Sequence, residues 1–62
     1  MPRSNLLTLQ EAADYLAISV GYLRRLVREK RIPYVKVGKY VRFNIRDLDG
    51  WLDARRVDPL PR

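Results

Sequence analysis

The sequence contains neither cysteine nor histidine. These absences exclude disulfide bonds, thiolate and imidazole metal sites, and nucleophilic catalysis that depends on Cys or His. No apolar run approaches the ~20 residues that a membrane-spanning helix needs. The first residues also lack the apolar segment of a secretory signal peptide. The compartment we expect is therefore the cytoplasm.

The chain is short, and its 62 residues allow one small domain. Folding of so short a chain buries only about 60% of the surface that the unfolded form exposes, so the core must be thin. Apolar residues make up 47% of the sequence and charged residues 32%, which is typical of a folded domain.

Acidic residues are nearly absent from the middle third of the chain. Between Ser19 and Arg42 there are eight Lys or Arg residues and a single acid, Glu29, which gives this segment a net charge of +7. The rest of the chain carries −1, so the middle segment supplies the whole net charge of +6. Because protein surfaces usually intersperse the two signs, this concentration indicates a polyanionic partner.

The first helix has a clear start signal. Thr8 and Glu11 have the spacing of a capping box, in which each side chain bonds the other residue's backbone N–H. Apolar residues then recur at helical spacing, at Leu9, Ala12, Ala13 and Leu16. The pattern predicts a helix from about residue 9 to residue 16.

A second helix is expected from Val20 to about Lys30. Ser19 is a favourable N-cap, and Pro33 is expected to end the helix because the residue before a proline is pushed out of helical conformation. One side of this helix is apolar, and the other carries Gly21 and arginines. Two helices joined by about three residues, the second of them basic, match the helix-turn-helix arrangement.

Two alternating runs on either side of Gly38 predict a β-hairpin. A two-residue loop would mix polar and apolar residues on both faces, whereas a three-residue loop over residues 38–40 would separate them. Since a one-residue slip moves every side chain to the opposite face, we expect the three-residue loop. It pairs Val37 with Val41 and Val35 with Phe43, and it places Lys36 beside Arg42 on the other face.

A third helix is expected after Asn44, its N-cap. Its apolar face comprises Ile45, Leu48, Trp51 and Leu52. The expected fold is mainly α with a small β-hairpin, a winged helix-turn-helix of three helices and a two-stranded wing. We expect one DNA-binding domain over residues 1–56 and a flexible C-terminal tail over residues 57–62, which contain two prolines and no periodicity.

Several motifs in this order resemble the excisionase (Xis) family, the small MerR-like winged helix-turn-helix domains of phages and mobile elements. The matching stretches lie within residues 7–52 and read LTLQEAADYLAIS, LRRLVREKRIP, VKVGKYVRF and RDLDGWL. The chain departs from the family at Ala17 and Lys30, where the family often has glycine. A left-handed backbone at a helix end costs a non-glycine residue roughly 1 kcal/mol.

The resemblance implies an architectural role on DNA. Excisionases bind double-stranded DNA near a phage attachment site, often as several copies, and bend it so that the integrase can assemble the complex that removes the prophage. The implied partners are duplex DNA, a phage integrase and further copies of the chain on adjacent sites, in a bacterial host cell. No enzymatic activity, cofactor, metal or membrane partner is implied. The same domain occurs in transcription regulators, so a small helix-turn-helix regulator is an alternative.

The candidate DNA-binding residues form two groups. The second helix would enter the major groove, where an arginine can donate two hydrogen bonds to guanine, and the wing would reach the minor groove or phosphates. The first group comprises Ser19, Val20, Gly21, Tyr22, Arg24, Arg25 and Arg28, and the second comprises Arg31, Lys36, Lys39, Tyr40 and Arg42. Alternatively, individual arginines contact phosphates only, and Lys36 and Arg42 only keep an edge strand soluble.

Two alternatives to DNA binding belong to other classes of function. Asp49 and Asp53 lie four residues apart on the third helix and could pair on a metal, although nearby arginines offer a simpler reason for these acids. An active site also needs a concave pocket, which so small a core rarely forms. The remaining alternative is a protein-interaction module whose basic surface docks an acidic partner.

Overall fold

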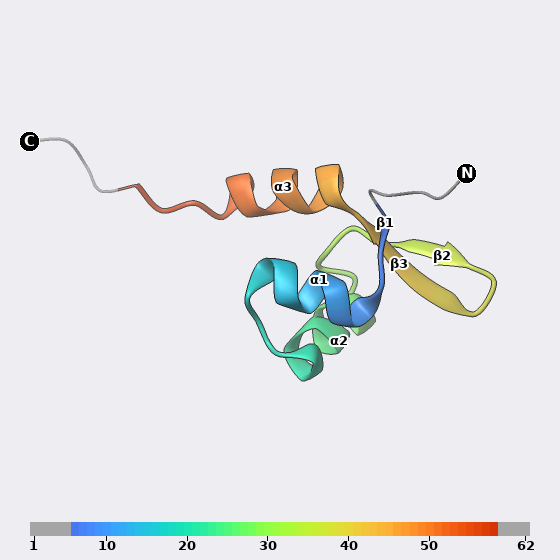
Figure 1. Ribbon diagram of the computed structural model, residues 1–62. Helices are drawn as coiled ribbons and strands as arrows, with labels where there is room; N and C mark the ends of the chain where they lie inside the picture. The colour runs from blue at the N-terminus through green and yellow to red at the C-terminus, as the bar shows by residue number, and fades with distance from the viewer. Residues whose placement is uncertain (1–5, 59–62) are drawn as a thin grey trace, which may run out of the picture.

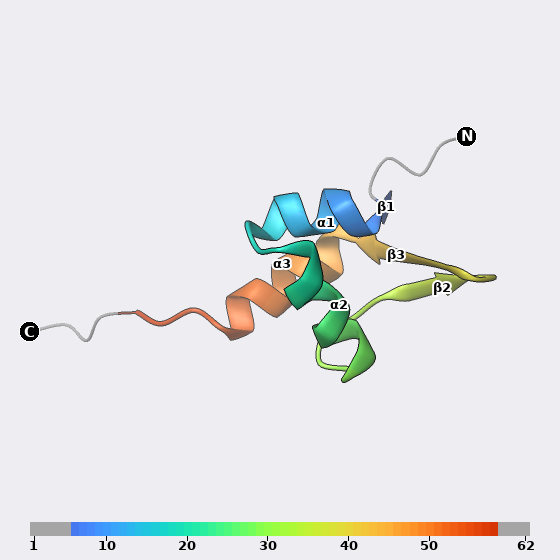
Figure 2. The same cartoon turned by 90° about the horizontal axis from the view of Figure 1, so that it is seen from below.

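The computed structural model describes residues 6–58, which form a winged helix-turn-helix of three helices and a three-stranded antiparallel sheet. In chain order the elements are β1 (Leu6–Leu7), α1 (Leu9–Leu16), α2 (Val20–Arg28), β2 (Val35–Val37), β3 (Tyr40–Asn44) and α3 (Ile45–Ala54). In both Figure 1 and Figure 2 the β2–β3 hairpin projects to one side of the three helices. Among the described residues, no helix is long and apolar enough to cross a membrane. Part of the expected tail, residues 59–62, lies outside the described residues.

The helix starts are those that the sequence predicts. The Thr8 hydroxyl accepts from the Glu11 backbone N–H at 3.2 Å, and the Glu11 carboxylate accepts from the Thr8 N–H at 2.9 Å, which completes the capping box. Ser19 caps α2, and Asn44 caps α3 by accepting from the Arg46 N–H at 2.9 Å. Each cap satisfies a backbone donor that has no partner within its helix.

The two left-handed positions are retained without glycine. Ala17, directly after α1, has φ 58°, and Lys30, just beyond α2, has φ 57°. Around Lys30, the Lys30 N–H donates to Val27 and the Arg31 N–H donates to Leu26, the two bonds of a Schellman motif. The prediction that Pro33 ends α2 is therefore wrong. The helix ends at Arg28, because the left-handed backbone at Lys30 interrupts it before the chain reaches Pro33.

The core is small and draws on all the longer elements. Its eight buried residues are Ala12, Ala13, Leu16, Leu23, Leu26, Ile32, Phe43 and Leu48. Phe43, Leu23 and Leu48 are the largest of the fully buried side chains, and they bring β3, α2 and α3 together. This small cluster fixes α2 against α1 and the sheet, and so decides which side of α2 faces outward.

The apolar face expected on the third helix is only partly buried. Leu48 is buried and Trp51 packs at the edge of the core, but Leu52 keeps 38% of its surface exposed. In Figure 2 the C-terminal end of α3 is directed away from α1 and the sheet.

The sheet contains a strand, β1, that the sequence pattern does not predict. β1 pairs antiparallel with β3, with Leu6 opposite Asn44 and Leu7 opposite Phe43. β3 is therefore the central strand, and β2 forms one edge. The expected two-stranded wing is accordingly part of a three-stranded sheet whose third strand has only two residues.

The expected three-residue loop of the hairpin is wrong. Val35 lies opposite Arg42, Lys36 opposite Val41 and Val37 opposite Tyr40, which leaves the two-residue loop Gly38-Lys39. Gly38 has φ 60°, and a left-handed glycine at the first loop position suits a tight two-residue hairpin turn. The alternation of apolar residues gave the wrong register for two reasons. Phe43 pairs with β1 rather than with β2, and the hairpin projects beyond the core, so burial does not select one register over another.

Candidate nucleic-acid interface

α2 presents a basic side to solvent because its apolar side is fixed in the core. Leu23 and Leu26 are buried, with 0% and 2% of their surface exposed. At 100° per residue, the outward side of such a helix carries Gly21, Arg25 and Arg28, with Arg24 and Tyr22 at its flanks. All five residues are exposed, as the sequence predicts.

At the start of α2, two of the candidate residues have structural roles. The Ser19 hydroxyl accepts from the Tyr22 backbone N–H at 3.1 Å, so this oxygen already has a capping partner. Val20 is half-buried and packs against the core, so it contributes less to the outward surface than expected. Tyr22 is exposed and is the aromatic residue of this outward surface.

Gly21 has no structural reason to be glycine within the described part of the chain. It is the second residue of α2, glycine costs up to about 1 kcal/mol relative to alanine within a helix, and a Cβ placed there meets no atom within 4 Å. The space in front of Gly21 is therefore available for a close approach by DNA.

We expect Gly21→Ala to stabilise the free domain by about 0.5–1 kcal/mol while weakening its binding to DNA. Gly50→Ala is the control, because a Cβ at Gly50 also meets no atom within 4 Å but Gly50 lies on α3 rather than α2. Thermal unfolding and gel shifts on the same duplex measure both effects. Equal DNA affinity for the two alanine variants would show that DNA does not approach Gly21 closely.

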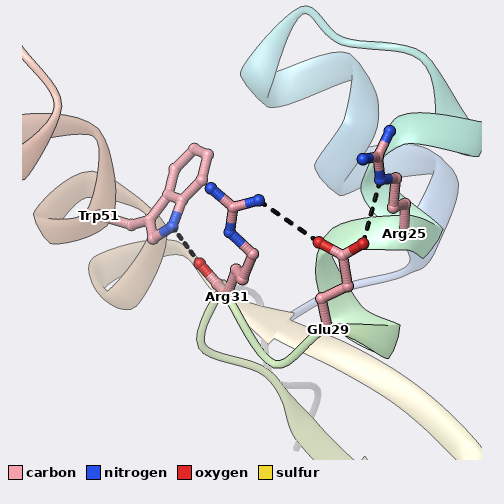
Figure 3. Close-up of polar contacts among 4 residues, drawn as sticks. All are labelled: Arg25, Glu29, Arg31 and Trp51. Atoms are coloured by element: carbon pink, nitrogen blue, oxygen red, sulfur yellow. Dashed lines mark hydrogen bonds and ion pairs between the residues drawn. The ribbon is translucent and has the colours of Figure 1, made fainter.

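Glu29 joins two of the candidate arginines. Its carboxylate accepts from Arg25 Nε at 3.1 Å and pairs with Arg31 Nη1 at 3.4 Å (Figure 3). The hydrogen bonds from Arg25 and, second, from Arg31 hold the pKa of Glu29 below its ordinary value. Glu29 is therefore a carboxylate at neutral pH, and it locally reduces the positive charge beside α2.

The segment after α2 is anchored to α3 by a tryptophan. Trp51 donates from Nε1 to the Arg31 carbonyl oxygen at 2.8 Å, and the Arg55 guanidinium lies 4.1 Å from the centre of the Trp51 ring. This contact fixes the backbone of Arg31, whose side chain reaches Glu29 (Figure 3). α3, far along the chain, thus helps to place Arg31 just after α2.

The wing distributes its candidate residues over two faces. Directly opposed residues of a hairpin share a face, so Arg42 lies with Val35, Val37 and Tyr40, and Lys36 lies on the other face with Val41. The expectation that Lys36 and Arg42 lie together is therefore wrong, and the two-residue loop is the cause. Val37 and Tyr40 are 52% and 54% exposed, so this outer face is apolar and aromatic as well as basic.

Tyr40 gathers the cations of the wing around its ring. Lys39 Nζ lies 5.6 Å and the Arg42 guanidinium carbon 5.3 Å from the ring centre, both within the range of cation–π attraction. Arg42 also donates to the Val41 carbonyl oxygen at 2.8 Å. The loop residue Lys39 stays exposed at the end of the hairpin, as the sequence predicts.

The contacts of Glu29 and Trp51 were missed in the sequence. The spacing of Arg25 and Glu29, four residues apart on a helix, is a signal that could have revealed the first ion pair. The Arg31 pair and the Trp51 hydrogen bond have no such signal, because they depend on how the segment after α2 folds back beside α3.

Asp49 and Asp53, the candidate metal pair, do not form a metal site with other acids in the described part of the chain. Asp49 accepts a hydrogen bond from the Tyr15 hydroxyl, which links α3 to α1. This hydrogen bond is the main cause that raises the pKa of Tyr15, and burial and the charge of Asp49 add to it. Within residues 6–58, no group of three or more Asp or Glu residues is arranged to hold a metal ion.

Comparison with known proteins assigns the fold to a family. A chain of Mycobacterium tuberculosis (strain ATCC 25618 / H37Rv) named "Putative antitoxin VapB50" is 47% identical over 45 residues, which cover 73% of this chain and 35% of that protein. The chain thus spans about a third of the length of this relative. No solved structure matches. The family model described as a helix-turn-helix domain matches residues 6–56, almost the whole described region, and the chain belongs to this family.

Proposed function

We propose that this protein is a sequence-specific DNA-binding and DNA-bending protein without catalytic activity, acting as an excisionase that promotes prophage excision by an integrase. α2 enters the major groove with Arg24, Arg25 and Arg28, and the wing contacts the minor groove or phosphates through Lys39 and its neighbours. Further copies occupy adjacent sites, since one small binding surface gives modest specificity.

The observation that carries this proposal is the exposed basic side of α2. Three arginines lie along little more than one helical turn, they are all exposed, and the helix is held by buried Leu23 and Leu26. Family membership supports the same conclusion, because the second helix of a DNA-binding helix-turn-helix lies in the major groove. The motifs shared with excisionases favour the bending role.

Bending can be measured once a preferred site is selected from a random duplex library. We expect fragments that carry this site at different positions to migrate differently in a gel when the protein is bound, because a bend near the centre slows a fragment most. Fragments with a scrambled site serve as the control. Identical migration at every site position would contradict the bending role. The protein would then be a DNA-binding protein that does not bend its site.

The similarity to the mycobacterial protein favours a second candidate, a small DNA-binding regulator. Such a protein would bind an operator and repress or activate a promoter without an integrase. The neighbouring genes discriminate between the two functions. An adjacent integrase gene supplies the partner for an excision assay, whereas a divergent operon supplies a promoter for a transcription assay.

A further inference from the structure

Glu29 occupies an unexpected place for an acid. It is the single acidic residue between Ser19 and Arg42, and it follows directly on α2, beside the side that we assign to DNA. Its side chain is 38% exposed, so burial does not explain its position. A carboxylate there repels phosphates, which is a cost for any protein that binds DNA through charge alone.

The geometry of the Arg25–Glu29 pair suggests what offsets this cost. Glu29 accepts from Nε of Arg25, and no other hydrogen bond to the Arg25 side chain occurs within the described region. The two terminal nitrogens of Arg25 point away from Glu29 (Figure 3). A guanidinium needs two neighbouring N–H donors to contact guanine O6 and N7 together. Nη1 and Nη2 of Arg25 remain available to donate these two hydrogen bonds.

Glu29 is itself held from its other side. Its second oxygen pairs with Arg31, whose backbone carbonyl accepts from Trp51 of α3. The chain of contacts from Trp51 through Arg31 and Glu29 to Arg25 therefore connects a packed part of the domain to one exposed arginine (Figure 3). Arg24 and Arg28 form no ion pair among residues 6–58, so this support is particular to Arg25.

We propose that Glu29 is a positioning residue that determines specificity: it orients Arg25 for a two-bond contact with a guanine and opposes the binding of Arg25 to phosphates at other sequences. This inference rests on the proposed DNA-binding function. It assigns base reading to Arg25 and leaves Arg24 and Arg28 free to contact phosphates.

The test is Glu29→Gln, which keeps the shape of the side chain and removes its charge. Dissociation constants are measured for the duplex selected by the unmodified protein and for a scrambled duplex of the same length and composition. We expect tighter binding to the scrambled duplex and no gain on the selected one, so that the ratio of the two constants falls about tenfold, the lower range of what one bidentate pair supplies.

Two further variants distinguish the orientation of Arg25 by Glu29 from a general effect of removing one negative charge. Asp53→Asn removes the same charge from α3, where Asp53 forms no ion pair with any residue between Ser19 and Arg42, and should leave the ratio unchanged. In the Arg25→Ala background, Glu29→Gln should change the ratio no further, because the arginine through which it acts is gone.

Three results would overturn the proposal. These are an unchanged ratio in Glu29→Gln, the same fall in ratio in Asp53→Asn, or a further fall in ratio when Glu29→Gln is added to Arg25→Ala. Selection of no preferred duplex by the unmodified protein would instead refute sequence-specific binding itself, so failure of the proposed function can be told apart from failure of the role of Glu29.

Discussion

An increase in salt from 50 to 200 mM is expected to weaken binding to duplex DNA by about a thousandfold. The segment from Ser19 to Arg42 carries a net charge of +7, and all of its arginines and lysines are exposed except Arg42, which is half-buried. Each phosphate that they neutralise releases condensed counterions, and about six such contacts give this salt dependence. Fluorescence anisotropy with a labelled duplex over a salt series measures the slope directly.

The same titration tests the protein-interaction alternative. A basic surface that docks an acidic protein would give weak binding to duplex DNA at every salt concentration, with an affinity below that for an acidic peptide. A decrease of less than tenfold between 50 and 200 mM would mean that few phosphates are contacted, and it would contradict binding of DNA through α2 and the wing.

Arg25→Ala and Arg28→Ala are each expected to weaken binding to the selected duplex by about 1–3 kcal/mol. Both residues lie on the outward side of α2, opposite buried Leu23 and Leu26, and neither supports the core. We therefore expect both variants to unfold at nearly the temperature of the unmodified protein while losing affinity. Gel shifts on the selected and scrambled duplexes measure the effect.

Arg56→Ala is the matched control for these variants. Arg56 follows α3, whose C-terminal end is directed away from the wing in Figure 1, and it pairs with Asp58 rather than with any residue between Ser19 and Arg42. Figure 2 shows the same separation of the α3 end from the hairpin after the molecule is turned. Affinity equal to that of the unmodified protein in both Arg25→Ala and Arg28→Ala would remove the assignment of α2 as the recognition helix.

The helices could be predicted closely because their signals are local. The Thr8–Glu11 capping box and the Ser19 cap act over three residues, and the structure contains both. The predicted end of α2, at about Lys30, is two residues too late, because Lys30 itself gives no local signal for the left-handed turn and only the family resemblance indicates one there. A glycine at that position would have predicted it.

The sequence by itself determined the order and type of the longer elements and the concentration of positive charge between Ser19 and Arg42, since caps, periodicity and charge are properties of neighbouring residues. The tertiary structure alone decided the pairing of β1 with β3, the register of the wing and the partners of Glu29. These depend on which segments meet across the core. In so thin a domain, Phe43 is the buried residue of the hairpin strands. Burial is therefore too weak to select the hairpin register that the apolar pattern predicts.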